Sequence, residues 1–282
     1  MPELPEVETI VSQLNQKVIG KEMVSAEIYD SAVVDPKIKT ITPVKISKIW
    51  RRGKLIIFEL SDGNYLLAHL RLTGHFHFFV RKQQEESNRN NKCNHKFYLQ
   101  KDYLHFIAAK FTFSDASFLT FNSIRKFERM QLADRNQLQE ILAKYGPEPL
   151  ESTFTLDEFR KTLASKRNAN IKTTLMDYKV IAGIGNIYAQ EMLYHAGISP
   201  LHKIGSLSSA ETERLYLQMK KTLISAIKYK GSTVDNYSNL EGEGSFQKRL
   251  AVYNKSKCEQ GHPLKKINLG GRGTSYCPIC QK

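Results

Sequence analysis

The stretch Cys258-Glu259-Gln260-Gly261-His262 is followed in the C-terminal region by Cys277-Pro278-Ile279-Cys280. Two thiolates with two residues between them can bind one tetrahedral metal ion across a tight turn. Cys258 and His262 form a second close pair, so the four side chains match a structural zinc site of the Cys3His type. We therefore predict a zinc finger around one structural Zn²⁺ ion, held by Cys258, His262, Cys277 and Cys280.

Two other interpretations of these residues stay open. His262 could be a surface residue beside a three-cysteine site that another residue completes. The Cys277-x-x-Cys280 pair could instead be a redox pair, although the sequence lacks the βαβ context of thioredoxin-like proteins. Three of the four cysteines cluster here in a chain without a secretory signal, which favours a metal site over disulfides.

The same region is strongly basic. The chain has 42 Lys and Arg residues against 28 Asp and Glu, a formal net charge of +14. Half of this excess lies between Ser245 and Lys282, where Glu259 is the single acidic residue. Arg272 has glycine on both sides, which leaves its backbone free to enter a tight groove. Concentrated positive charge of this kind fits binding to a polyanion, and nucleic acid is the predicted partner.

The remaining composition does not favour a membrane protein. No stretch of about 18 apolar residues is present, and the N-terminus is acidic where a secretory signal would be basic and then apolar. We expect a cytoplasmic protein, associated with the nucleoid in a bacterium, that has no membrane partner and is a monomer.

A glycine-rich turn precedes one of several predicted helices. Ile181-Ala182-Gly183-Ile184-Gly185 leads directly into Asn186-Ile187-Tyr188-Ala189. Backbone N–H groups at a helix N-terminus bind phosphate, and the Asn186 side chain adds a donor, although helical hairpins also turn through glycine. Helices are predicted over 155–164, 172–178, 186–196 and 209–229, and the last of them starts with the capping box Ser208-x-x-Glu211.

The first half of the chain has the pattern of a β-structure. Short β-rich runs, several separated by turn residues such as Ser61-Asp62-Gly63-Asn64, predict an antiparallel sandwich or barrel. The composition changes after about residue 133, and Gly146-Pro147-Glu148-Pro149 is interpreted as a linker. The predicted strands cover 23–29, 44–50, 55–60, 65–70, 76–80, 111–113 and 118–121.

The chain opens Met1-Pro2-Glu3-Leu4-Pro5-Glu6. Removal of Met1 would leave Pro2 with a free secondary amine, and an α-amino group with a pKa of about 7.7–8.0 is partly nucleophilic near neutral pH. Its attack on a sugar C1′ gives an iminium ion, while Glu3 and Glu6 could serve as general acid and base. The alternative is an ordinary Met-Pro start whose acidic residues favour the N-terminus of an amphipathic helix over 3–15.

A basic turn, Arg51-Arg52-Gly53-Lys54, leads into the predicted strand over 55–60. It could be an exposed hairpin. The alternative interpretation gives Lys54 a role at the Pro2 site, as a phosphate contact or proton donor.

These stretches, in this order, resemble the formamidopyrimidine-DNA glycosylase family, the bifunctional glycosylase/lyases of base-excision repair. The resemblance runs from the opening Pro-Glu-Leu-Pro-Glu through the Gly53-Lys54 turn and the stretch after Gly183 to Gly-Arg-Gly-Thr and Cys-Pro-x-Cys-Gln. It implies an α+β multidomain fold. The expected parts are an N-terminal helix plus antiparallel β-sandwich catalytic domain (1–132), a helix-two-turns-helix DNA-binding domain (133–230), and a connector with the C-terminal zinc finger (231–282).

The resemblance also implies a substrate and a set of residue roles. The expected partner is double-stranded DNA containing oxidised bases or abasic sites. Pro2 is implied as the nucleophile and Schiff-base former, and Glu3 as the acid that protonates the opening sugar. The full implied set is Pro2, Glu3, Glu6, Lys54 and Arg272 for catalysis, and Leu72, Arg125, Phe127, Arg167, Lys172 and Asn186 for DNA binding, with Leu72, Arg125 and Phe127 filling the space left by the damaged base.

The chain departs from the family at these space-filling residues. Leu72 stands where the family usually has methionine, and the usual Asp-Pro-Arg-Arg-Phe-Gly loop is here Ser123-Ile124-Arg125-Lys126-Phe127-Glu128. The family's DNA-contacting histidine has no clear counterpart, and His105 is the nearest.

We expect excision of oxidised purines such as 8-oxoguanine and formamidopyrimidines, followed by β,δ-elimination at the abasic site. Leu4 in the opening resembles the branch of the family that acts on purines. The alternatives are an oxidised-pyrimidine glycosylase of the endonuclease-eight type and a non-catalytic zinc-finger protein that binds damaged DNA.

Overall fold

The computed structural model describes residues 2–80, 106–233 and 239–282, and these form two compact units. The first contains Pro2 and the described parts of 6–142 and 233–244, and the second contains 3–5, 143–232 and 245–282. The predicted division into three domains stays a prediction. In the described residues, no helix is long and apolar enough to cross a membrane.

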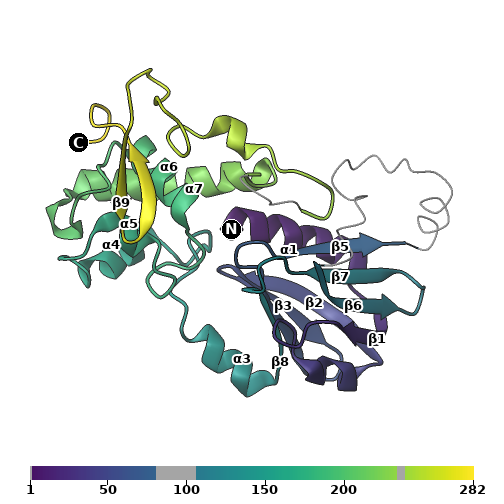
Figure 1. Cartoon of the computed structure of the whole chain (residues 1–282). Helices are drawn as coiled ribbons and strands as arrows, with labels where there is room; N and C mark the ends of the chain where they lie inside the picture. The colour runs from purple at the N-terminus through teal and green to yellow at the C-terminus, as the bar shows by residue number, and fades with distance from the viewer. Residues whose placement is uncertain (1, 81–105, 234–238) are drawn as a thin grey trace. The chain divides into compact units, whose positions relative to one another are not determined.

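The first unit is built on eight strands in the order β5-β7-β6-β1-β2-β3-β4-β8, and the strand pairs are antiparallel. β1 and β2 pair only through Glu22–Lys45 and Met23–Val44, so four strands lie on either side of this join. Figure 1 shows the two groups of strands. Their bounds are β1 Glu22–Ile28, β5 His75–Phe79, β6 Ile107–Phe113 and β7 Phe118–Asn122 on one side, and β2 Val44–Arg52, β3 Leu55–Leu60, β4 Tyr65–His69 and β8 Arg129–Ala133 on the other.

The two groups of strands enclose one apolar core. Phe58 on β3 and Phe76 on β5 belong to different groups, yet their ring centroids are 5.9 Å apart. Helix α1 (Leu4–Val18) adds Val7, Leu14 and other apolar residues at helical spacing to this core. A two-layer core of this kind is the packing expected of a β-sandwich, so the predicted sandwich is confirmed.

Two strands differ from the predicted ones. β6 begins at Ile107, earlier than predicted, and its residues Ala108 and Ala109 are buried. The sequence did not indicate this early start, because alanine has a low preference for strands. β8 was not predicted, because its exposed polar residues Arg129 and Gln131 alternate with buried ones over only five residues. The 3-10 helix η1 (Pro36–Ile41) and helix α3 (Arg135–Leu142) complete the named elements of this unit.

The second unit combines helices with a two-stranded hairpin. Helices α6 (Asn186–Ala196) and α7 (Ser209–Lys228) pack side by side, and α6 is buried over most of its length (Figure 1). The Tyr188 ring of α6 packs on Phe246, with centroids 5.8 Å apart. The other elements are α4 Leu156–Ala164, α5 Ile171–Leu175, η3 Ile204–Ser206, η4 Phe246–Arg249, β9 Lys265–Leu269 and β10 Arg272–Tyr276.

Local capping sets the ends of these helices. The predicted capping box of α7 is present, because Ser208 accepts from the Glu211 N–H and the Glu211 carboxylate accepts from the Ser208 N–H. The helix predicted over 172–178 instead ends at Leu175. Asp177 accepts from the Lys179 N–H, and this side-chain turn replaces the next helical turn. Two successive turns then lead from α5 to α6.

The segment Gly146-Pro147-Glu148-Pro149 is packed rather than a loose linker. The Pro147 carbonyl accepts from the Ala182 N–H at 3.0 Å, and Glu148 is buried. A Cβ at Gly146 would lie 2.5 Å from the Val180 backbone, so glycine permits this close approach. The segment therefore fixes the turns that precede α6.

Candidate functional site

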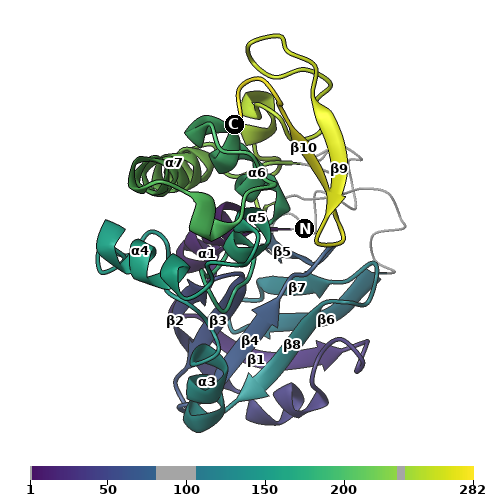
Figure 2. The same ribbon diagram turned by 90° about the vertical axis from the view of Figure 1, so that its left-hand side faces the viewer.

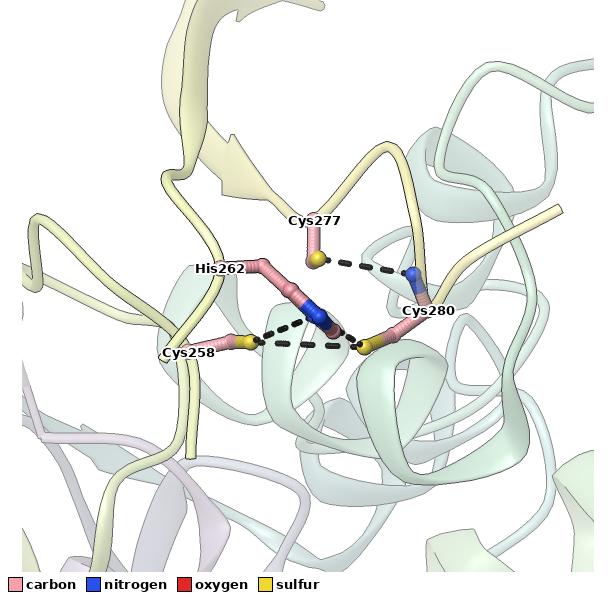
Figure 3. A group of neighbouring side chains, drawn as sticks. All are labelled: Cys258, His262, Cys277 and Cys280. Carbon is pink, nitrogen blue, oxygen red and sulfur yellow. Dashed lines mark hydrogen bonds between the residues drawn. The ribbon is translucent and has the colours of Figure 1, made fainter. Parts of the chain in front are cut away.

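The four predicted metal ligands lie together in the second unit. Figure 3 shows Cys258, His262, Cys277 and Cys280 pointing toward one another, and their ligand atoms all lie within 4.8 Å of one another. The Nδ1 atom of His262 is 3.7 Å from the Cys258 Sγ atom and 3.2 Å from the Cys280 Sγ atom. The three cysteines are free thiols, so the cluster is not a disulfide.

These distances fit a bound metal ion. Ligands about 2.0–2.3 Å from a tetrahedral zinc ion are separated by about 3.3–3.8 Å, and the Sγ atoms of Cys258 and Cys280 are 4.0 Å apart. One imidazole nitrogen and three sulfurs are the donor set that zinc prefers. The cluster can therefore bind one metal ion, and His262 takes part through Nδ1.

A buried carboxylate fixes the chain just before this cluster. The side chain of Glu191 on α6 is fully buried and accepts from the N–H groups of Ala251, Val252 and Tyr253 at 2.6, 3.1 and 2.8 Å. Burial raises the pKa of this carboxyl despite the three donors. These bonds join the start of the finger to α6.

The hairpin β9–β10 extends from the same region (Figure 2). Its two turn residues, Gly270 and Gly271, have φ values of +59° and +71°, which only glycine adopts without strain. Arg272 follows them directly and is exposed at the tip. The prediction of a glycine-flanked arginine at the end of a finger thus agrees with the local backbone.

The N-terminus of α6 holds the carboxylate of Glu3. Glu3 is buried, and its oxygens accept from the N–H groups of Ile187 at 2.9 Å and Tyr188 at 3.3 Å. The capping position, Gly185, has no side chain to satisfy these donors. Glu3 therefore caps the helix from a distant part of the sequence, and the first turn of α6 favours a negative charge there.

The glycines before α6 are required by this contact. A Cβ at Gly185 would lie 2.2 Å from the carboxyl carbon of Glu3, and a Cβ at Gly183 would lie 2.8 Å from the Leu4 side chain. The Gly183 carbonyl also accepts from the Leu4 N–H at 3.0 Å. The turn predicted to cradle phosphate thus also holds the N-terminal segment of the chain.

Lys172 lies at the centre of a buried polar network. Its Nζ atom donates to the Asn186 side-chain oxygen at 2.6 Å and to the Thr274 hydroxyl at 2.8 Å. Asn186 in turn donates to the Gly273 carbonyl at 3.1 Å. The family resemblance implies that Lys172 and Asn186 bind DNA, which stays a prediction, and in the structure the two side chains bind each other and the finger hairpin.

Electrostatics links the same residues. Burial lowers the pKa of Lys172 to about 8, with the charge of Glu3 opposing this change and the charge of Arg272 adding to it. Lys172 therefore lies within electrostatic range of both predicted catalytic residues of this unit. Glu3, Lys172, Asn186 and Arg272 form one group around the N-terminus of α6.

Arg167 lies apart from that group in the chain, in the exposed turn after α4. Its carbonyl accepts from the Gly205 N–H at 2.8 Å, and a Cβ at Gly205 would come within 3.1 Å of that oxygen. The backbone around Arg167 is therefore fixed while its side chain faces solvent, as a phosphate contact requires.

Pro2, Glu6 and Lys54 belong to the first unit, and the first two are buried. Gly53 and Lys54 form the two-residue turn between β2 and β3, with Gly53 at φ +56°. Burial, together with the charges of Arg71 and Lys54, lowers the pKa of His69 to about 4. His69 is therefore neutral at pH 7, and its Nδ1 atom accepts from the Arg71 N–H at 3.1 Å.

The three residues predicted to fill the space of a flipped base lie on two turns of this unit. Leu72 is half-buried, whereas Arg125 is exposed and Phe127 has 58% of its surface exposed. The Arg125 N–H donates to the Thr73 hydroxyl at 3.2 Å, so the two turns are in contact. The structure therefore brings these three residues onto neighbouring turns, and Phe127 presents a large exposed aromatic ring.

The described residues do not include His105, Cys93, to which the sequence assigns no role, or the polar, Asn-rich segment 81–95, which the sequence predicts as a loop. The sequence did not indicate Glu128, Thr274 and Glu191, because each of them binds at least one partner far away in the chain. The sequence does contain a signal for a special role of Glu128, since it is the one acidic residue in the loop 123–128, which otherwise carries basic charges.

Comparisons with known proteins give a consistent result. The family models for the formamidopyrimidine-DNA glycosylase N-terminal domain and H2TH domain match residues 1–130 and 145–238. The formamidopyrimidine-DNA glycosylase of Desulfitobacterium hafniense (strain DSM 10664 / DCB-2) is 36% identical over 292 residues, covering 100% of both chains. The chain belongs to the formamidopyrimidine-DNA glycosylase family. The resemblance seen in the sequence is thereby confirmed.

Solved structures of family members agree with the fold. The Lactococcus lactis Fpg in complex with an abasic site containing DNA is 31% identical, with a TM-score of 0.84 over 99% of each chain. A mutant of the same protein in complex with a Fapy-dG containing DNA has 31% identity and a TM-score of 0.85 over 100% of each chain. The predicted fold class of the formamidopyrimidine-DNA glycosylases is therefore confirmed, while the roles of single residues stay predictions.

Proposed function

We propose that this chain is a bifunctional DNA glycosylase and abasic-site lyase of base-excision repair. Its substrate is double-stranded DNA that contains oxidised purines or abasic sites. The observation that carries the proposal is the placement of Glu3 on the first turn of α6, in one group with Lys172, Asn186 and Arg272. This arrangement positions an acid next to cationic and amide donors, in a family whose members are named for this chemistry.

The reaction starts at Pro2 once Met1 has been removed. The Pro2 nitrogen forms a bond to C1′, the bond from C1′ to the base nitrogen breaks, and the base leaves with that electron pair and takes up a proton. Glu3 protonates the ring oxygen O4′ as the C1′–O4′ bond breaks. The Pro2 nitrogen, having lost its proton, then forms a double bond to C1′ as an iminium ion.

The iminium ion is the electron sink for two eliminations. A base removes a C2′ proton and the C3′–O bond breaks, which releases the 3′ side of the strand as a 5′-phosphate. Loss of the C4′ proton then breaks the C5′–O bond and releases a 3′-phosphate on the other side. Water hydrolyses the remaining iminium, which frees the sugar fragment and restores Pro2. Glu6 and Lys54 are proposed to assist in these proton transfers.

DNA is held mainly through its phosphates. Arg272 at the hairpin tip and Arg167 after α4 are exposed cations on well-fixed backbone, and Asn186 adds an amide donor at the start of α6. Lys172 is proposed to act in this group by orienting Asn186 and the hairpin. Each direct phosphate contact contributes to affinity and makes binding dependent on salt.

The four-ligand cluster is proposed to hold one structural Zn²⁺ ion. With three thiolates and one imidazole in place, such an ion has no open position for substrate and serves to stabilise the finger. Cys258 and Cys277 are buried in a small apolar cluster with Tyr194, Ala251 and Val252, and the ion would stabilise this cluster. The ion thereby fixes the hairpin that carries Arg272.

Flipping the damaged nucleotide costs a few kcal/mol. We assign Leu72, Arg125 and Phe127 to the space that the nucleotide leaves, which offsets part of this cost. Related formamidopyrimidine-DNA glycosylases come from bacteria, and we place the activity in the cytoplasm, at the nucleoid.

The test is strand cleavage of duplexes that contain one 8-oxoguanine, one thymine glycol or one abasic site. We expect cleavage at 8-oxoguanine and at the abasic site, with phosphate on both ends of the gap. Faster cleavage at thymine glycol would favour the oxidised-pyrimidine alternative. Binding without cleavage of any duplex would favour a non-catalytic protein that recognises damaged DNA.

A further inference from the structure

Both turns that carry the space-filling side chains contain a residue in the left-handed region. Arg71, directly before Leu72, has a φ of +48°, and Lys126, between Arg125 and Phe127, has a φ of +56°. Neither is glycine, so each costs about 1 kcal/mol or more and needs surrounding contacts to persist. The loop from Ser123 to Glu128 also contains no proline or glycine that would set its conformation.

One buried carboxylate, that of Glu128, is at the centre of the contacts that join the two turns, while the Arg71 N–H donates to His69. One of its oxygens accepts from both the N–H group and the hydroxyl of Thr73, at 2.9 and 2.7 Å. The other oxygen accepts from the Ser123 hydroxyl. Glu128 has no exposed surface, so it cannot itself touch DNA.

The two hydroxyls extend the bonds to the loop backbone. The Thr73 hydroxyl accepts from the Arg125 N–H at 3.2 Å, and the Ser123 hydroxyl accepts from the Lys126 N–H at 3.1 Å. Each hydroxyl donates its one hydrogen bond to the Glu128 carboxylate and accepts one from a backbone N–H group of the loop. The network therefore needs an acceptor-only group at its centre, and a carboxylate is such a group.

Packing makes the arrangement specific. A Cβ at Gly74 would lie 2.6 Å from the Glu128 Cγ atom and 2.7 Å from the Leu70 carbonyl oxygen, so Gly74 leaves the space that Glu128 fills. Burial raises the pKa of the Glu128 carboxyl, but the bonds from Ser123 and Thr73 outweigh burial and leave the pKa below its ordinary value. The carboxylate is thus ionised and fully bonded at neutral pH.

We propose that Glu128 is a positioning residue for base flipping, which holds the Leu72 turn and the Arg125–Phe127 loop in one fixed arrangement. The inference rests on the proposed function, because it assigns to Glu128 the support of side chains that enter the DNA stack. It goes beyond that function by naming what replaces proline and glycine in this loop. Preorganisation of this kind reduces the cost of ordering the two turns on the DNA.

The test compares two substrates of the same sequence, an 8-oxoguanine:cytosine duplex and an abasic-site duplex. An abasic site has no stacked base to extract, so its cleavage depends little on the space-filling side chains. Glu128→Ala should slow 8-oxoguanine excision under single-turnover conditions by about tenfold or more, and abasic-site cleavage by no more than about threefold. Glu128→Gln, which keeps the shape and one acceptor oxygen, should restore part of the lost rate.

Thr73→Val and Glu59→Ala complete the design. Thr73→Val removes only the hydroxyl and should show the same split between the two substrates as Glu128→Ala. Glu59→Ala, a partly buried glutamate on β3 outside the network, should keep both rates. The fluorescence of 2-aminopurine next to the lesion, which rises on unstacking, should show a smaller amplitude with Glu128→Ala and Thr73→Val only.

Two results would overturn the inference. One is unchanged 8-oxoguanine excision and 2-aminopurine amplitude in Glu128→Ala. The other is an equal loss on both substrates in folded Glu128→Ala, Glu128→Gln and Thr73→Val, which would limit Glu128 to a role in stability. If Glu128→Ala does not fold, Glu128→Gln and Thr73→Val show whether 8-oxoguanine excision is slowed more than abasic-site cleavage. A wild-type chain inactive on both duplexes would instead refute the proposed function.

Discussion

A Cβ atom placed on Gly185 would lie 2.2 Å from the carboxyl carbon of Glu3. Gly185 has extended backbone angles that any residue adopts, so glycine is needed there for space and not for conformation. The glycine-rich turn before α6 and the acidic start of the chain are thus two halves of one contact. Two stretches separated by most of the sequence are explained by the same geometry.

Gly185→Ala should therefore reduce activity by displacing Glu3. A displacement of about 1 Å at a catalytic group costs about 100-fold in rate, and we expect a loss of this order in abasic-site cleavage. Single-turnover cleavage measures it. Gly20→Ala is the control, because a Cβ there meets nothing within 4 Å and only its positive φ adds strain. A Gly185→Ala chain as active as the wild type would show that Glu3 need not occupy this position.

Lys172→Met should weaken DNA binding by about tenfold or more. The change leaves the Asn186 oxygen and the Thr274 hydroxyl without their buried partner, and a hydrogen bond to a charged group contributes about 1.5–3 kcal/mol. The dissociation constant for abasic-site DNA is the readout. Lys161→Met, at an exposed lysine paired with Glu158, should bind as the wild type does. Equal affinities for all three chains would contradict the orienting role of Lys172.

The pKa of Lys172 adds a dependence of stability on pH. The folded chain has a pKa of about 8 at this amine, whereas the ordinary value is 10.5. Between these values the unfolded state binds more protons, so the free energy of unfolding should rise with pH from 8 to 10.5. Urea unfolding of wild type and Lys172→Met across this range tests the sign. If the free energy of unfolding rises equally with pH in both chains, the pH dependence comes from groups other than Lys172.

Buried histidines should destabilise the first unit in acid. Burial lowers the pKa of His77 to about 3, with the charge of His75 adding to it, and the pKa of His69 lies at about 4. From pH 6.5 down to 4 the unfolded chain takes up protons that the folded chain does not, so stability falls. Each such group contributes up to about 1.4 kcal/mol per pH unit.

Urea unfolding at pH 7, 6 and 5 provides the measurement for the histidines. His77→Phe should reduce the slope, because the variant lacks one of the groups that protonates on unfolding. A slope insensitive to His77→Phe would mean that His77 is protonated in the folded chain.

Zinc removal should disable DNA binding before it unfolds the first unit. We expect one zinc ion per chain by elemental analysis, loss of the ion with Cys277→Ala, and its retention with His262→Cys, since thiolate and imidazole both bind zinc. DNA affinity should fall with the metal content. A chain that binds abasic-site DNA equally well with and without the ion would contradict the proposed role of the cluster.

Features encoded by neighbouring residues were predictable from the sequence. The metal cluster follows from two short spacings, and the Ser208–Glu211 capping box lies within one helical turn, so neither depends on knowledge of the fold. Strands with strong apolar runs were also found. The β8 strand was missed, since its pattern covers only five residues, two of them polar.

Contacts between distant residues could not be read from the sequence. Glu3 was predicted as an acid, but its bonds to Ile187 and Tyr188 require residues 3–5 to lie at the start of α6, and no local pattern encodes that contact. The link between Glu128 and Thr73 likewise depends on the pairing of β4 with β8. The sequence shows the charge of Lys172 but not its burial, so its bonds to Asn186 and Thr274 could not be predicted, and its contact with DNA stays a prediction.

The central claim is that the Pro2 nitrogen forms the covalent bond to DNA. Borohydride reduces an iminium ion to a stable amine, so wild-type chain incubated with abasic-site or 8-oxoguanine duplex should be trapped as a covalent adduct. Peptide mass spectrometry should place the adduct on Pro2, and Pro2→Gly or a retained N-terminal tag should lose most of the adduct while DNA binding persists. No adduct with the untagged wild type, or an adduct on a lysine, would contradict the account.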